Sequence, residues 1–141
     1  MNGRFLPTVL QVAAALQLGI AMLNLFLVPL LRWQVEISRM PLLLREVFQV
    51  HAWFISVTLT LFAVLTWRFA NDIAGPGSPI GHWLSAGIGM FWALRTVLQI
   101  TYYSSSHWRG QPARTAIHIL LLLLYCGFAA AYLWAAFNAR R

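Results

Sequence analysis

Residues 115 to 137 read TAIHILLLLLYCGFAAAYLWAAF, a run without Asp, Glu, Lys or Arg. A helix needs about 20 predominantly apolar residues to cross the hydrocarbon core of a bilayer, and this run has that length. Comparable runs cover residues 6–31, 47–70 and 81–104. The sequence therefore predicts an all-α integral membrane protein, a four-helix transmembrane bundle.

The composition supports this class. Of the 141 residues, 60% are hydrophobic and 9% are charged, whereas a soluble domain carries about 25% charged residues. A chain with so few charges cannot cover a water-exposed surface. Lipid must therefore cover most of the surface of this protein. The length allows one domain. We expect a single transmembrane domain over residues 1–141, with both termini on one side because the number of spans is even.

The net charge of +7 comes from ten basic residues, all of them Arg. Most of them lie at the ends of the apolar runs, where lipid phosphates sit, which favours membrane lipid over nucleic acid as the partner. Their distribution between the two sides does not decide the orientation. Cys126 is the only cysteine, so no disulfide forms within the chain. The first run exceeds the 7–15 apolar residues of a signal peptide, and we expect it to stay as a helix.

The connections carry the expected turn and interface signals. Residues 75–79 read GPGSP, and Gly110 and Pro112 follow a run of serines, so both segments predict turns. The connection Arg32–Glu46 is expected to hold a short amphipathic segment at the interface. Tryptophans near the ends of the runs predict an aromatic belt; they are Trp33, Trp67, Trp83 and Trp108.

Each predicted span contributes one polar residue at a similar depth, roughly 9–12 Å from the midplane at 1.5 Å of rise per residue. These residues are Asn24, His51, Gln99 and His118. Helical spacing groups polar side chains on shared faces, and polar groups avoid lipid, so these faces should point inward. The stripes are Gln17 with Asn24; Arg95 with Gln99 and Tyr102; and His118 with Tyr125 and Tyr132. We therefore expect one interior site, with Arg95 beneath it and Tyr102 above it.

Arg95 is predicted to lie only roughly 4 Å from the midplane, where a charge is costly and needs a partner. No predicted span contains Asp or Glu, and Glu46 at the mouth of the bundle is the nearest acid by this reasoning. Either Glu46, Gln99 and water satisfy Arg95, or an external anion does. A haem propionate, a lipid phosphate or a carboxylate of a partner subunit would serve.

His51 and His118 belong to helices that lie diagonally in an up-down bundle, roughly 12–14 Å apart. Two imidazoles can face a haem iron across such a gap. Adding His107 and Glu46 would give a nitrogen-and-oxygen set that suits zinc, copper or iron. Four interpretations remain open: a structural hydrogen-bonded layer, a haem b site, another transition-metal site, and proton or quinone handling around Arg95, Gln99 and Tyr102.

Small residues recur at four-residue intervals in the third run, at Gly81, Ser85, Gly89 and Ala93. Such a ridge allows another helix to approach closely. We expect it to contact a helix of the bundle or of a partner.

Residues 95–118 carry the pattern Arg95-x3-Gln99-x2-Tyr102-Tyr103, then His107-Trp108-Arg109-Gly110, then Thr115-x2-His118. This stretch resembles a group of small bacterial membrane proteins with four spans. The resemblance implies the four-span layout and a bacterial inner membrane, but no function.

The short connections leave no room for a substrate domain, and the pattern shows no His–acid arrangement near Ser56 or Ser85. We therefore expect a binding or accessory subunit of a larger respiratory or photosynthetic membrane complex rather than a free-standing enzyme. Other membrane subunits would then be its partners. The alternatives are a redox protein that binds haem b or a metal through His51 and His118, and a proton- or quinone-handling protein.

Overall fold

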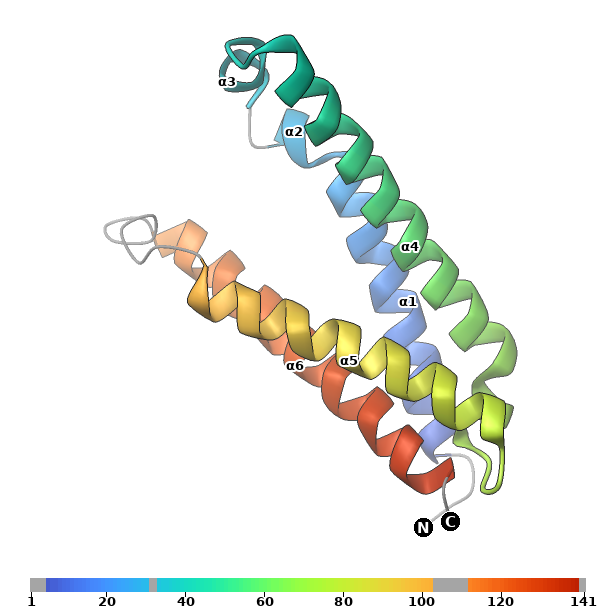
Figure 1. The fold of residues 1–141 in the computed structure, drawn as a ribbon. Coiled ribbons are helices and arrows are strands. Elements are labelled where there is room, and N and C mark those ends of the chain that lie inside the picture. The colour runs from blue at the N-terminus through green and yellow to red at the C-terminus, as the bar shows by residue number, and fades with distance from the viewer. Residues whose placement is uncertain (1–4, 31–32, 103–111, 140–141) are drawn as a thin grey trace. The chain divides into compact units, whose positions relative to one another are not determined.

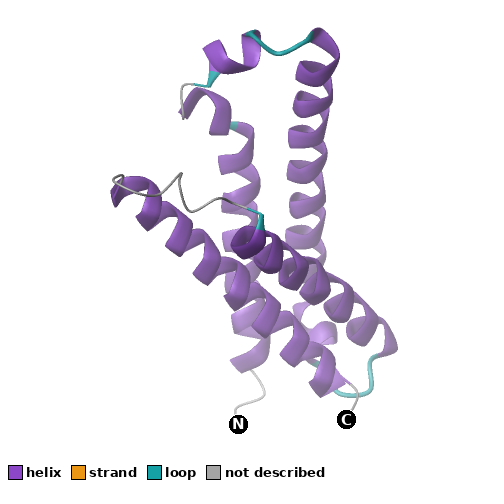
Figure 2. Cartoon of the chain, turned by 60° about the vertical axis from the view of Figure 1, so that its left-hand side comes forward, coloured by secondary structure: helices purple, strands orange, loops and turns teal. Residues whose placement is uncertain are grey.

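A computed structural model describes residues 5–30, 33–102 and 112–139 of the chain. Helices and short connections make up these residues, with no strand among them (Figure 2), which confirms the all-α prediction. The helices are α1 (Phe5–Leu25), α2 (Leu27–Leu30), α3 (Gln34–Ser38), α4 (Leu42–Ala74), α5 (Pro79–Thr101) and α6 (Pro112–Ala139).

Three helical segments are long and apolar enough to cross a membrane. They are α1, α4 and the part of α6 over Thr115–Asn138. The membrane class is thereby confirmed at this level. Helix α5 has 23 residues, which is also a spanning length. It is not among the three, and Arg95 and Gln99 are the residues that lower its hydropathy most in its C-terminal half.

The chain divides into two compact units, one over residues 11–68 and one that joins residues 1–10 to residues 69–141. In the second unit, α5 and α6 run side by side in opposite directions (Figure 1) and make extensive contact. In the first unit, the main part of α1 lies beside α4.

The first predicted span is too long, because α1 ends at Leu25 and not at residue 31. The physical reason is Pro29. A proline ring clashes with the carbonyl group four residues earlier, which here belongs to Leu25, and proline has no N–H to donate. Phe26 forms a turn, and the four-residue helix α2 follows it.

The second predicted span is too short, because α4 covers Leu42–Ala74 where 47–70 was expected. Its backbone departs from helical geometry at Phe69, with φ −112° and ψ 21°. Helix α3 occupies the connection for which a short amphipathic segment was predicted, and Glu36 lies in its first turn. The predicted bounds of α5 and α6 agree with the structure to within three residues at the ends that it describes.

Helix α5 starts at a well-defined cap. The Ser78 hydroxyl accepts a hydrogen bond from the Gly81 N–H at 3.0 Å, and Pro79 occupies the first turn, where its missing N–H costs nothing. Gly77 precedes the cap with φ +74°, a left-handed conformation that favours glycine.

Aromatic side chains form the core of the α5–α6 pair. Trp92 is 1% exposed and its ring centroid lies 4.7 Å from that of Phe128. Tyr125 and Tyr132 of α6 are also buried, which confirms the predicted inward orientation for these two members of their stripe. Gln17 of α1, also predicted to point inward, is fully buried and donates to the Ala13 carbonyl at 3.4 Å.

Candidate functional site

The polar contact that joins α5 and α6 is formed by Gln99 and His118. Gln99 Nε2 lies 2.8 Å from His118 Nδ1. Gln99 is only 4% exposed, and His118 is half-buried. Both lie toward the same end of the helix pair, because Gln99 is in the last turn of α5 and His118 in the second turn of α6. The structure therefore brings together two of the residues predicted for an interior site.

Gln99 also carries an unsatisfied group. Its Oε1 atom is buried and has no hydrogen-bond partner within the described part of the chain. A buried acceptor without a partner costs roughly 1–3 kcal/mol. Such an atom is a position where a further donor would bind favourably.

Arg95 lies one helical turn before Gln99 and faces the same neighbouring helix. Its guanidinium carbon is 4.9 Å from the centre of the Tyr125 ring. That ring stacks on Trp92, with centroids 5.2 Å apart and an interplanar angle of 27°. The aromatic face of Tyr125 is thus a partner for Arg95 within the helix pair. Interactions of this kind contribute about 0.5–2 kcal/mol, the larger values where water is excluded.

Asn24 makes its polar contacts within the other unit. Its amide Nδ2 donates to the Ala52 carbonyl at 2.8 Å and to Ser56 Oγ at 2.9 Å. Ser56 in turn donates to Ala52 at 3.0 Å, and Thr60 donates to the Ser56 carbonyl at 2.8 Å. The two bonds of Asn24 tie α1 to α4. Ser56 is 3% exposed, and the sequence analysis missed its role because a serine in a span carries no distinctive spacing.

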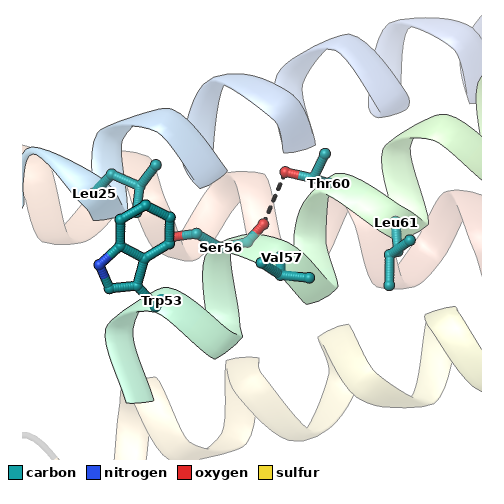
Figure 3. Close-up of a pocket in the computed structure, with 6 residues that line it drawn as sticks. All are labelled: Leu25, Trp53, Ser56, Val57, Thr60 and Leu61. Carbon is teal, nitrogen blue, oxygen red and sulfur yellow. Dashed lines mark hydrogen bonds between the residues drawn. The ribbon is translucent and has the colours of Figure 1, made fainter. Parts of the chain in front are cut away.

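An open pocket of about 220 Å³ lies beside these bonds (Figure 3). The Trp53 side chain lies at one end of it in this view and Leu61 at the other. Its lining is mostly apolar, and the hydroxyls of Ser56 and Thr60 are engaged by neighbouring carbonyls. The pocket therefore presents packing surface rather than reactive groups.

The remaining predicted site residues are exposed or lie outside the residues that the structure describes. His51 and Glu46 on α4 are exposed, and Tyr102 after α5 is 84% exposed. His107 lies outside the described residues. Among the residues that are described, no three His, Cys, Asp or Glu side chains are grouped as metal ligands would be. The common site of all four spans and the haem and metal alternatives stay predictions.

His82 in the first turn of α5 has a defined structural role. Its Nδ1 lies 2.9 Å from the Ala136 carbonyl oxygen. Because a carbonyl only accepts, Nδ1 carries the proton. Ala136 belongs to the last turn of α6, whose carbonyl groups have no partner within the helix, so His82 caps the end of α6.

Comparison with known proteins gives no relative. No protein family, no curated protein and no solved structure matches this chain. The resemblance of residues 95–118 to small bacterial four-span proteins therefore stays a prediction.

Proposed function

We propose that the chain is a four-span bundle of a bacterial inner membrane and that it binds and releases a proton at the His118–Gln99 pair, as an accessory subunit of a larger membrane complex. The four-span layout is supported by the contacts of α5. Its polar residues Ser85 and Gln99 are buried, so they face protein and not lipid. A helix with its polar groups covered in this way can cross a bilayer despite its lower hydropathy.

The placement of both termini on one side has support from the start of α1 and the end of α6. The Phe5 ring lies 6.1 Å from the Trp134 ring, centroid to centroid. Trp134 lies in the last two turns of α6. The start of α1 and the end of α6 are therefore adjacent within their unit, which is what an even number of spans requires.

The observation that carries the proposed chemistry is the hydrogen bond between a titratable imidazole and a buried amide in an apolar helix pair. Histidine is the side chain whose charge ordinarily changes between about pH 5 and pH 8. Ionisable residues in membrane spans are costly and commonly mark proton or ligand pathways. The position near the end of α5 and the start of α6 suits exchange of a proton with one face of the membrane.

Of the alternatives, quinone handling uses the same residues, and Gln99 Oε1 would then accept from a quinol hydroxyl. Haem or metal binding through His51 and His118 differs from proton binding, because the purified protein would then contain a haem or a bound metal. A visible absorption spectrum and metal analysis of the purified protein would detect these groups, whereas proton binding needs neither of them.

The test is a titration of the histidine side chains in lipid nanodiscs with ¹⁵N-labelled histidine. The signal of His118 is assigned by its loss in His118→Gln. We expect it to show a protonation step as the pH is varied. We also expect Gln99→Leu to move the midpoint of that step, because it removes the hydrogen-bond partner. A signal that keeps one form throughout the titration, or a midpoint that ignores Gln99→Leu, would overturn the proposal.

A further inference from the structure

The two ends of the Gln99 side-chain amide are chemically opposite, because Nε2 donates hydrogen bonds and Oε1 accepts them. One end faces His118 Nδ1 at 2.8 Å. The other end lies in a buried position with no hydrogen-bond partner among the described residues. The orientation of the amide therefore determines which kind of group the pair presents to that position.

A neutral His118 fits the arrangement seen in the structure. Nδ1 is then an acceptor, the Gln99 Nε2–H group donates to it, and the imidazole proton resides on Nε2. Oε1 occupies the unpartnered position. An unpaired carbonyl oxygen is tolerated in protein interiors more often than an unpaired N–H group, so this orientation is the favourable one for a neutral ring.

A protonated His118 reverses the requirement. Both ring nitrogens then donate, so Nδ1–H and the Gln99 NH₂ group would face each other as two donors. Rotation of the amide by half a turn relieves this conflict, because Oε1 then accepts from Nδ1–H. The NH₂ group moves into the position that Oε1 had occupied.

We infer that protonation of His118 rotates the Gln99 amide, so that the buried position beside the pair changes from a hydrogen-bond acceptor to a hydrogen-bond donor. This inference rests on the proposed function, since it assigns a consequence to the proton that His118 takes up. It provides a way for a proton to select what the site binds. A hydroxyl donor fits the neutral state and a carbonyl acceptor fits the protonated state.

Gln99 is the hydrogen-bond partner that the structure gives for Nδ1 of His118. Among described side chains, Arg95 is the charged group on this face of α5, and Tyr125 is the titratable group further along α6. Tyr102, which follows α5, is exposed. Residues 79–101 and 112–139 contain no Asp or Glu. No carboxylate of these two helices can therefore take the imidazolium proton or pair with it.

The same linkage works in the opposite direction. Whatever binds in the second position changes the proton affinity of His118 by the same factor as the proton changes its binding. Neither amide orientation satisfies both ends, and each leaves one buried polar atom of the amide unpaired within the pair. A third group that bonds to the unpaired end of the amide therefore favours one orientation over the other. It can do so without breaking an existing hydrogen bond.

The decisive measurement is the ¹⁵N–¹⁵N coupling through the hydrogen bond, in nanodiscs with labelled histidine and glutamine side chains. An N–H···N bond transmits this coupling, and an N–H···O bond does not. We expect coupling between Gln99 Nε2 and His118 Nδ1 above the His118 midpoint and its loss below. Coupling that persists through the titration, or is missing at both extremes, would overturn the inference.

The controls separate the two proposals. If His118 shows no protonation step, the proposed function fails. If His118 titrates while the coupling behaves otherwise than expected, only the amide rotation fails. Gln99→Leu should abolish the coupling at every pH while the His118 signal remains, which confirms its assignment. His82, whose Nδ1 donates to a carbonyl, should show no such coupling.

Discussion

Arg95 shows how a single charged residue is accommodated among apolar neighbours. Its guanidinium lies over the face of Tyr125, which is 6% exposed and stacked on Trp92. The negative face of an aromatic ring attracts a cation, and the attraction grows where water is excluded. The ring thus provides stabilisation that a carboxylate would otherwise have to provide in this helix.

Replacing the ring should therefore destabilise the α5–α6 pair. We expect Tyr125→Leu to lower the free energy of unfolding by about 2 kcal/mol, through loss of the cation–π contact and of the stacking on Trp92. Tyr125→Phe keeps the ring and should retain most of that stability. Denaturant titration in detergent micelles, followed by circular dichroism, measures both. Equal losses in the two variants would show that the hydroxyl matters more than the ring face.

His82 has a structural role that can be tested in the same way. His82→Ala removes the bond to the Ala136 carbonyl, and we expect a loss of about 1 kcal/mol in unfolding free energy. Ile80→Ala is the matched control, because Ile80 lies in the same turn and is 79% exposed. It should change the stability by less than His82→Ala. If His82→Ala lowers the unfolding free energy by no more than the control does, the Ala136 carbonyl finds another donor.

At the level of elements, α5 and α6 approach each other through Gly89. A methyl group placed on Gly89 would come within 2.9 Å of the Leu133 side chain and 3.1 Å of the Leu133 backbone nitrogen. Gly81 makes a similar close approach to the end of α4, where the Asp72 carbonyl oxygen would lie 2.6 Å away. The predicted contact of the small-residue ridge with other helices is confirmed at both glycines.

Two glycines of α5 provide a matched test of this packing. Gly89→Ala should lower the unfolding free energy by about 1–3 kcal/mol, because the new methyl group forces the helices apart. Gly87→Ala has nothing within 4 Å of the new atom and should raise it by about 0.4–1 kcal/mol, because alanine restricts the unfolded chain. Thermal unfolding of both variants and the unaltered protein measures the two changes in stability. The same sign of change in both would mean that the close approach does not limit the packing.

The whole molecule raises the question of topology. If the four-span layout is correct, residues between α4 and α5 lie on the side of the termini, and residues between α3 and α4 lie on the opposite side. In a Cys126→Ser background, single cysteines at Pro76 and Arg39 should react with a membrane-impermeant maleimide from opposite faces of sealed vesicles. Cysteine at Asn138 should react from the same face as Pro76. Labelling of Pro76 and Arg39 from one face would contradict four spans.

The sequence alone determined the class of this protein, because uninterrupted apolar runs have one favourable environment, the hydrocarbon core of a bilayer. It also indicated the polar residues, since Gln99 and His118 lie at positions where a polar side chain has to find a partner. It did not place the ends of the helices, because local features such as Pro29 act within long apolar runs.

Only the tertiary structure decided which polar residues meet. Sequence spacing gives the face and depth of a residue on its own helix, but not the neighbour that this face contacts. The structure pairs Gln99 with His118 and places Arg95 on Tyr125, while Asn24 is satisfied by Ser56 and Ala52. The reason is that helix packing depends on close approaches such as Gly89 against Leu133, which fix the rotation of α5 against α6.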